Sequence, residues 1–555
     1  MTNSRHYLSL AGAIALGAVL RFWHLDLKPL WMDEVITAIF SLGKNYHDLP
    51  LNVAFPLERV QEIFTFQPGV SCHQIAENVA NQSTHPPLFF CGMYRWLGWM
   101  TPLGSEWVEK LRSLPALFGV GAIAAIYGVN RIAFSPTSGI IAALIMAVSP
   151  FAVYLSQEAR HYTMPMFLIT LSLLGLMQIQ RDIFEEQRLK IWVWILWTII
   201  NSIGLYVHYF FVLAFVAEIA TLLVLISWGK PKITNQRQIW LALILSTSGV
   251  VISFVPWLLV TWHHFQSSET NWLPSPNFIA PLYQTLISWV LMVIALPVEN
   301  QPPLITAICG LLMVSFAIWV GQQIFKGLKI LWLQDRTHLA TLTLLSFTIF
   351  VIFQFFAIVY LLDKDITAVP RYAFVYYPSF CALLAASVNT SQKSKFILLF
   401  IGLISCIFIV YNLAFQKPFQ PEKVAQNINL EPAIPVILVV GYSNNQDIAL
   451  GLSFALALEK VRSSTSASVI HSDSFALLDK KPDLAVLWNK LDQIPVPKAS
   501  KLNLWIVGPG MRRRDYPKQV ALSGQTTCTI DPTQHYRIGI PYQLYRCSNA
   551  NFRNL

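Results

Sequence analysis

Long apolar runs separated by short polar loops dominate the first three quarters of the chain. A helix that spans a bilayer needs roughly 20 mostly apolar residues, and about eleven runs approach that length. These runs are 7–23, 114–132, 140–155, 165–179, 191–206, 209–228, 239–260, 304–325, 339–362, 373–388 and 396–415. The pattern predicts a mainly α, polytopic membrane protein of about eleven transmembrane helices.

Two further apolar runs fit a span less well. Residues 88–100 are too few to cross a bilayer and carry Arg95 near their middle, which favours a helix lying at the interface. Residues 282–297 would break the alternation of basic and non-basic loops, so we expect an interfacial or re-entrant piece there. Basic loops, such as 181–190 and 393–395, are typical of the cytoplasmic side, which predicts an internal N-terminus and an external C-terminus.

The pattern divides the chain into two predicted domains. Residues 1–416 form the transmembrane domain, with a long, mixed first external loop over 25–112 that includes interfacial helices. From about residue 417 the composition changes, and the runs 435–440 and 504–507 predict buried strands around a helix over 447–461. Residues 417–555 are therefore expected to be a small α/β extracytoplasmic domain.

Composition places the chain in the membrane class. Apolar residues make up 55% and charged residues 12%, with a mean hydropathy of +0.51. The net charge of +10 fits cytoplasmic loops rather than nucleic-acid binding. Of 7 cysteines, Cys528 and Cys547 lie in the external polar tail, where we expect a disulfide, with two thiols as the alternative.

Asp33 and Glu34 follow directly on the first apolar run. Carboxylates near hydrocarbon are costly, so their default interpretation is functional. A carboxylate can also take the proton of a weakly nucleophilic hydroxyl during attack. The alternative is an ordinary polar flank of a helix.

Four more polar clusters fall on the same external side in this topology. They are His85 with Pro86-Pro87, the Glu158, Arg160 and Tyr162 segment, His208-Tyr209, and Arg371-Tyr372. Each one alone could be structural, because helix-end arginines and interfacial aromatics are common. Together they place acids, arginines and histidines at one surface, which suits a lipid that bears a phosphate. The histidines lack metal-ligand spacing, so no metal is indicated, although a divalent ion stays possible.

The ordered set of motifs resembles the GT-C glycosyltransferases, in particular the bacterial, family 39-like branch of the protein mannosyltransferase and aminoarabinose transferase superfamily. The motifs are Trp31-Met32-Asp33-Glu34, His85-Pro86-Pro87-Leu88, Ser156 to Tyr162, Leu205 to Phe210, and Arg371-Tyr372. The resemblance covers roughly residues 5–415. It implies polyprenyl-phosphate sugar donors, transfer with inversion on the external face, and a catalytic acidic residue that corresponds to Asp33. His85 stands where aminoarabinose transferases usually have Lys, as in the protein mannosyltransferases, and the β-trefoil domain of the eukaryotic enzymes is absent.

The resulting hypothesis is a plasma (inner) membrane glycosyltransferase with Asp33 as base and Glu34 in a positioning role. His85, Arg160, Tyr162, Arg371 and Tyr372 are the candidate phosphate-binding residues, and Glu158, His208 and Tyr209 are further candidates. The expected partners are the lipid-linked donor, a lipid, glycan or protein acceptor, and the bilayer; no nucleic acid and no certain cofactor is predicted. A lipid or sugar transporter or flippase is the main alternative, and a non-catalytic scaffold is the second.

Overall fold

The structure, a computed structural model, describes residues 3–83, 85–228, 236–262, 273–389, 391–465, 473–497, 499, 501–523 and 526–548. The chain forms two compact units. The first contains Met1–Leu27, Ala76–Met93 and Glu109–Phe415, and the second contains Lys28–Ile75, Tyr94–Val108 and Gln416–Leu555. The predicted division at residue 416 stays a prediction, and the structure adds that most of the first loop groups with the C-terminal segment.

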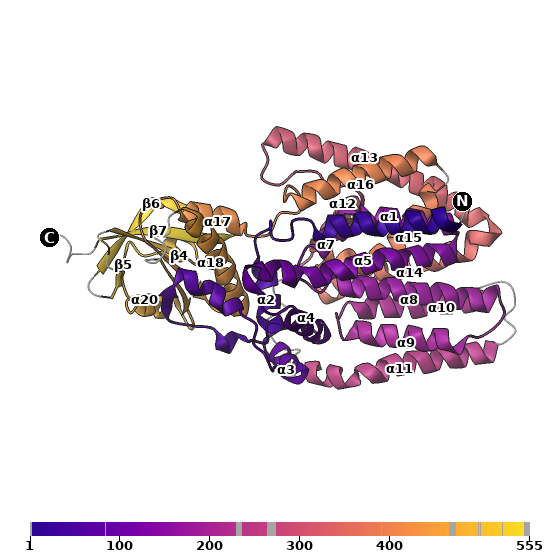
Figure 1. Ribbon diagram of the computed structural model, residues 1–555, viewed down its shortest axis with the longest axis horizontal. Helices are drawn as coiled ribbons and strands as arrows, with labels where there is room; N and C mark the ends of the chain where they lie inside the picture. Colours follow the sequence, from indigo (N-terminus) through magenta and orange to yellow (C-terminus); the bar gives the residue numbers. More distant parts are fainter. Residues whose placement is uncertain are drawn as a thin grey trace. The chain divides into compact units, whose positions relative to one another are not determined.

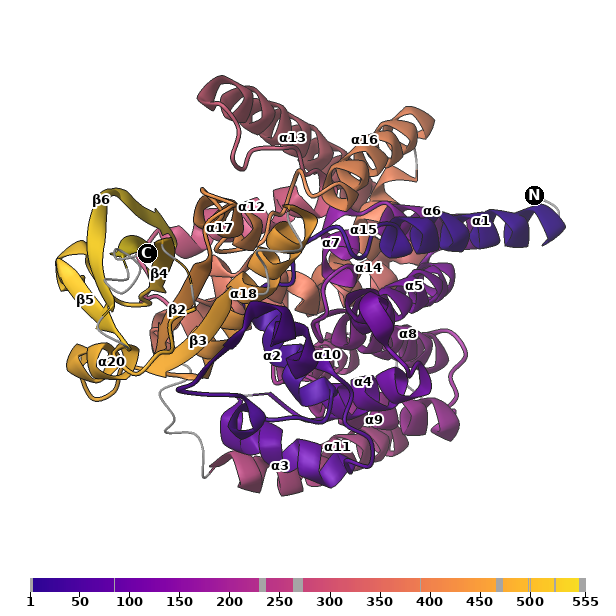
Figure 2. The same cartoon turned by 60° about the vertical axis from the view of Figure 1, so that its left-hand side comes forward.

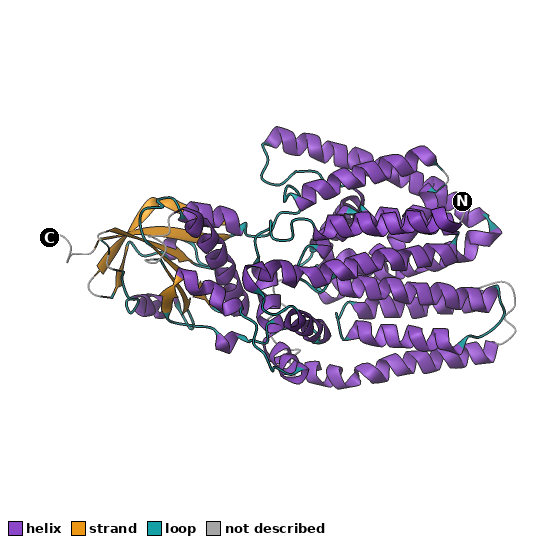
Figure 3. Cartoon of the chain, viewed as in Figure 1, coloured by secondary structure: helices purple, strands orange, loops and turns teal. Residues whose placement is uncertain are grey.

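Helices make up the first unit (Figure 3). They are α1 (Asn3–Phe22), α5 (Trp107–Ala133), α6 (Pro136–Ala147), α7 (Pro150–Ser156), α8 (Thr163–Phe184), α9 (Ile191–Leu205), α10 (Phe211–Trp228), α11 (Gln236–Trp262), α12 (Ala280–Val293), α13 (Pro303–Leu333), α14 (Asp335–Leu362), α15 (Tyr377–Val388) and α16 (Gln392–Val410). The short 3-10 helices η5 (Ile366–Ala368) and η6 (Pro370–Val375) connect α14 to α15. The neighbours α8, α9 and α11 pack in sequence, and α10 packs on α8 and α14 (Figure 1).

The apolar helices identify a multi-pass membrane protein. Six described helices, α5, α8, α11, α13, α14 and α16, are long and apolar enough to span a bilayer. On α13 the side chains of Leu304, Leu311 and Phe325 are 71%, 69% and 73% exposed, as expected for a surface that faces lipid. The apolar helices α9, α10, α12 and α15 are shorter, and length alone does not show whether they span a bilayer. The number of eleven spans therefore stays a prediction.

The predicted span over 140–155 contains a break, and its status as one span stays a prediction. The structure has two helices there, α6 and α7, bent by 58° relative to each other. Pro150 begins α7, and proline lacks the N–H that would continue a helix from α6. The hydroxyl of Ser149 accepts the Ala152 N–H at 3.4 Å and so caps the new helix.

Two other predicted elements occur close to their expected bounds. The run 88–100 forms α4 (Leu88–Trp99), and the run 282–297 forms α12 over 14 residues. Each is shorter than the roughly 20 residues that a straight span requires. The division between the units passes through α4 and through α3 (Cys72–Gln82).

A seven-stranded mixed sheet is the centre of the second unit, with strand order β1-β3-β2-β4-β7-β6-β5. The strands are β1 (Ala54–Pro56), β2 (Val436–Tyr442), β3 (Ser474–Asp479), β4 (Lys501–Val507), β5 (Gln519–Leu522), β6 (Thr526–Ile538) and β7 (Ile540–Ser548). The helical elements are α2 (Met32–Ser41), η1 (Tyr46–Asp48), η2 (Leu57–Phe64), η3 (Gly104–Glu106), α17 (Pro421–Ile428), α18 (Asn445–Thr465), α20 (Leu484–Leu491) and η7 (Arg513–Asp515). The predicted C-terminal α/β fold is confirmed.

The central strands of this sheet are parallel and apolar. Strand β2 pairs in parallel with β3 on one side and β4 on the other, and the other pairings are antiparallel. Helix α18 packs on β2 and β3 (Figure 2). Because both faces of the central strands are covered, Val436–Val440 and Leu502–Val507 are apolar almost throughout and buried.

Two local features connect distant parts of the second unit. Strand β1, from the first loop, pairs with β3, so that Ala54 lies opposite Ala476. Cys528 and Cys547 lie opposite each other on β6 and β7 with their Cα atoms 4.0 Å apart, and form a disulfide.

Candidate active site

The acid pair lies in the first turn of α2, in the second unit. Asp33 is 9% exposed, and Glu34 is completely buried. Negative side chains in the first helical turn interact favourably with the helix dipole. The hydroxyl of Ser453 on α18 donates to the carbonyl oxygen of Leu30 at 2.7 Å, which fixes the entry to this helix.

Glu34 has a buried cationic partner that the sequence did not reveal. Lys417 Nζ lies 3.7 Å from Glu34 Oε2 and 5.8 Å from the centroid of the Trp31 ring. A buried charge pair that loses one member leaves an uncompensated charge, so this contact ties residue 417 to the start of α2. Glu34 is thereby engaged in packing, whereas Asp33 keeps a small solvent-accessible surface.

A second group of functional candidates gathers in the first unit, at the ends of several helices. We call it the arginine–histidine group; its members are His85, Arg160, His161, Tyr162, His208, Arg371 and Tyr372. They come from the segment before α4, the α7–α8 junction, the α9–α10 junction and η6.

The two arginines of this group meet at one tyrosine. Arg371 Nε donates to Tyr162 Oη at 3.0 Å, and the Arg371 and Arg160 guanidinium carbons lie 5.8 and 5.7 Å from the Tyr162 ring centroid. Arg160 Nη2 lies 3.3 Å from His85 Nε2. Since a guanidinium can only donate, His85 Nε2 accepts, and the ring proton lies on Nδ1, which is 2.9 Å from Ser83 Oγ.

Three histidine rings lie in series beside the arginines, with one edge-on and one tilted contact. His161 lies between His85 and His208, at centroid distances of 4.7 and 4.6 Å. Burial, followed by the neighbouring charged groups, lowers the pKa of His85 and of His161 well below the usual value. Burial and then Arg160 lower the pKa of His208 to about 3, so all three rings are neutral at pH 7.

Of the remaining candidate residues, one contacts this group and the others have different partners. The ring of Tyr372 packs edge-on against Phe210 at 4.7 Å and lies 6.3 Å from Tyr162. Glu158 is completely buried and is hydrogen-bonded to the Tyr154 hydroxyl. Tyr209 is bonded to α11, where its hydroxyl accepts from Trp257 Nε1 at 3.1 Å.

A known family model matches part of the sequence, and a solved structure matches the fold over nearly the whole chain. The family model described as dolichyl-phosphate-mannose-protein mannosyltransferase matches residues 85–259. The crystal structure of ArnT from Cupriavidus metallidurans bound to undecaprenyl phosphate is 13% identical, with a TM-score of 0.51, and covers 98% of each chain. This chain has the GT-C fold. The predicted resemblance to the GT-C glycosyltransferases is therefore confirmed at the level of fold.

Two further GT-C structures are similar at lower scores. The apo form of the same ArnT is 11% identical, with a TM-score of 0.49, and covers 90% of this chain and 92% of that one. The archaeal oligosaccharyltransferase AglB from Archaeoglobus fulgidus, in complex with an inhibitory peptide and a dolichol-phosphate, is 12% identical, with a TM-score of 0.42 and coverage of 82% and 63%. No curated protein matches the sequence.

His161 is the member of the group that the sequence motifs left unassigned in this GT-C chain. It is completely buried, and both of its ring nitrogens are without a hydrogen-bond partner among the described residues. The only signal in the sequence was its place between Arg160 and Tyr162. No set of three or more His, Cys, Asp or Glu side chains in the described part of the chain is arranged to hold a metal ion.

Proposed function

We propose that this GT-C protein is a membrane glycosyltransferase that transfers a sugar from a polyprenyl-phosphate donor to an extracytoplasmic hydroxyl or amine, with inversion. The observation that carries the proposal is the arginine–histidine group, of which Arg160, His161, Tyr162 and His208 are buried. Two guanidiniums held at one tyrosine, beside neutral imidazoles, form a site suited to a single anionic phosphate.

The donor phosphate is the leaving group of the proposed reaction. The acceptor oxygen or nitrogen attacks the anomeric carbon, the bond from that carbon to the phosphate oxygen breaks, and negative charge grows on the phosphate. Arg160 and Arg371, supported by His85, Tyr162 and Tyr372, stabilise this charge, since preorganised donors act strongly in a water-poor site. A separate general acid is not required, because the departing phosphate needs little protonation.

Asp33 is the proposed base that takes the acceptor proton. Glu34 holds the start of α2 through its buried contact with Lys417, which fits a positioning role. Asp33, with its small exposed surface, is the carboxylate of the pair that a substrate can reach. We propose these two roles for the acid pair and test them independently of the phosphate-binding residues.

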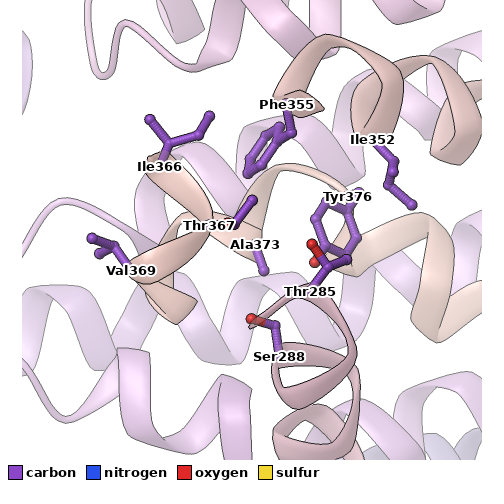
Figure 4. Close-up of a pocket in the computed structure, with 9 residues that line it drawn as sticks. All are labelled: Thr285, Ser288, Ile352, Phe355, Ile366, Thr367, Val369, Ala373 and Tyr376. Carbon is purple, nitrogen blue, oxygen red and sulfur yellow. The ribbon is translucent and has the colours of Figure 1, made fainter. Parts of the chain in front are cut away.

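The lipid tail has a proposed place beside η6, the element that carries Arg371 and Tyr372. A pocket there is lined by side chains from α12, α14, η5 and η6 (Figure 4). Its polar groups are engaged: Thr285 and Ser288 donate to carbonyl oxygens of their own helix at 2.8 and 3.0 Å. This pocket has only about 10 Å³ of space, enough for about one water molecule, so the proposed lipid tail lies beside the pocket and not inside it.

The proposal is tested with purified protein in lipid nanodiscs and a panel of polyprenyl-phosphate sugars, with mass spectrometry of lipid and acceptor. Asp33→Asn should lower turnover by roughly 10²–10⁴-fold, the usual loss for general-base catalysis, with donor binding retained. Glu34→Gln should lower turnover less. A well-folded Asp33→Asn variant with near-normal turnover would remove Asp33 as the base, and lipid movement without sugar transfer would indicate a flippase.

The proposed orientation has its own test. We expect cysteine-accessibility labelling to report positions 33 and 160 and the C-terminal unit on the extracytoplasmic side of a plasma (inner) membrane. Labelling of position 160 from the cytoplasm would contradict the topology and, with it, the proposed donor site.

A further inference from the structure

The second unit contains an open cleft of about 500 Å³ that the proposed transfer reaction does not use. This volume lies within the range typical of small-ligand sites, about 300–1,000 Å³. Its lining comes from loops that follow three strands and from the start of α18, α20 and β7. The lining residues are Ser443, Asn444, Asp447, Lys480, Leu484, Pro509, Gly510, Met511, Asp515 and Ile540.

The cleft lies at the carboxyl ends of the parallel strands β2, β3 and β4. The chain leaves β2 through α18 to reach β3 on one side, and then returns through α20 to β4 on the other side of β2. Connections from β2 and β4 therefore diverge at their carboxyl ends. In open α/β sheets, ligands bind in the crevice at such a point.

The floor of the cleft is held in place by its own charged groups. Lys480 Nζ lies 3.4 Å from Asp447 Oδ2 and also donates to the carbonyl oxygen of Pro509. Asp447 Oδ2 accepts the Ser443 N–H at 2.8 Å, and Asn444 Oδ1 accepts the Asp447 N–H at 2.9 Å. The negative charge of the Asp447 carboxylate already lies at the start of α18, which disfavours an anionic ligand there.

Hydrogen-bonding capacity remains on two of the lining residues. In the part of the chain that the structure describes, no hydrogen bond engages the Ser443 hydroxyl or the side-chain amide nitrogen of Asn444. Beside them lie the apolar side chains of Leu484, Met511 and Ile540. A ligand of this site would be uncharged, with hydroxyl groups along its edges and apolar C–H faces.

We propose that this cleft is a binding site for an uncharged saccharide. The hydroxyls of the sugar would pair with Ser443, Asn444 and the carboxylates of Asp447 and Asp515, while its C–H face would lie on Leu484 and Met511. The inference does not rest on the proposed transferase reaction, because binding is measured without any lipid-linked donor.

The test uses the full-length protein in detergent, with neutral oligosaccharides of glucose, galactose or mannose and matched uronic-acid oligosaccharides as probes. Saturation-transfer NMR and titration calorimetry should detect binding of at least one neutral oligosaccharide. Ser443→Trp narrows the cleft with a large side chain and should abolish binding. Asn444→Asp keeps an oxygen that accepts the Asp447 N–H but removes the amide donor, and should weaken binding about three- to tenfold, as expected for one hydrogen bond.

Ser463→Trp is the matched control. It lies exposed near the other end of α18, roughly 30 Å along the helix from Ser443 at 1.5 Å per residue, and should bind as the wild type does. Thermal melting checks the fold of each variant. If Ser443→Trp has a lowered melting temperature, the binding measured for Asn444→Asp tests the proposal instead. The proposal is overturned if no neutral oligosaccharide binds, if only the acidic probes bind, or if folded cleft variants bind like the wild type.

Discussion

Two clusters of polar side chains in the helical unit differ in the chemical groups that they bring together. In the first, which we call the Glu218 network, Glu218 on α10 accepts from Ser172 Oγ at 2.6 Å, Trp197 Nε1 at 2.8 Å and Asn201 Nδ2 at 3.3 Å. All three donors are neutral and come from the adjacent helices α8 and α9. The second is the arginine–histidine group, with two guanidiniums and with His161 unpartnered among the described residues.

The comparison separates a structural network from a candidate binding site. The Glu218 network directs its donors at one carboxylate and so joins three helices of the bundle, as interhelical hydrogen bonds do in membranes. The arginine–histidine group lies at helix ends rather than within helices and brings two guanidiniums to one tyrosine. Burial alone does not indicate function; the chemistry of the partners does.

The largest expected effect is on donor binding. Arg160→Lys and Arg371→Lys keep the charge but lose the planar fork, so each should weaken the affinity for a polyprenyl-phosphate about 10- to 100-fold. Glu218→Gln is the matched control and should bind the lipid normally. Affinity is measured by lipid titration in nanodiscs; unchanged affinity in both lysine variants would exclude these arginines from the site.

The second prediction concerns stability. Glu218→Leu leaves three buried donors without their acceptor and should lower the free energy of unfolding by about 1–2 kcal/mol, the scale of such interactions in membranes. Glu218→Gln keeps an acceptor oxygen and should lose less. Thermal unfolding in one detergent measures both, and an equal loss in the two variants would show that the network contributes only packing.

The third prediction is a pH dependence of the arginine–histidine group. The pKa of His208 is lowered in the folded state, so between pH 6.5 and its folded value the unfolded chain binds the extra proton and folding stability falls as the pH falls. The loss from pH 7.5 to pH 5.5 should be about 1.4 kcal/mol for this residue. His208→Phe should reduce the fall of the melting temperature at low pH, with the contribution of His85 and His161 remaining, whereas Glu218→Gln should leave this acid-side loss in place.

The smallest predicted effect is at His161. If its ring nitrogens serve the donor phosphate, His161→Phe should weaken donor affinity about three- to tenfold, the value of one hydrogen bond, with little change in melting temperature. His161→Asn restores a donor and should recover part of the affinity. Normal affinity in His161→Phe would assign this ring to packing between His85 and His208.

Local patterns were sufficient to predict the helices and the central strands. The run 435–440 became β2 and the run 504–507 lies within β4, because a strand covered on both faces must be apolar along its length. The ordered motifs likewise predicted the GT-C fold, since they preserve residue types at fixed places in the chain. The bend between α6 and α7 was visible as Pro150 but was outweighed by the continuous hydropathy around it.

The sequence does not reveal contacts between residues that are far apart in the chain. Glu34 and Lys417 are separated by almost the whole helical unit, and nothing near either residue indicates that they pair. The same holds for β1, a three-residue strand that pairs with β3. Such pairings depend on which surfaces the rest of the folded chain leaves uncovered. A local sequence pattern carries no information about those surfaces. The position of His161 between two other histidines has the same cause: three separate junctions meet there only in the folded unit.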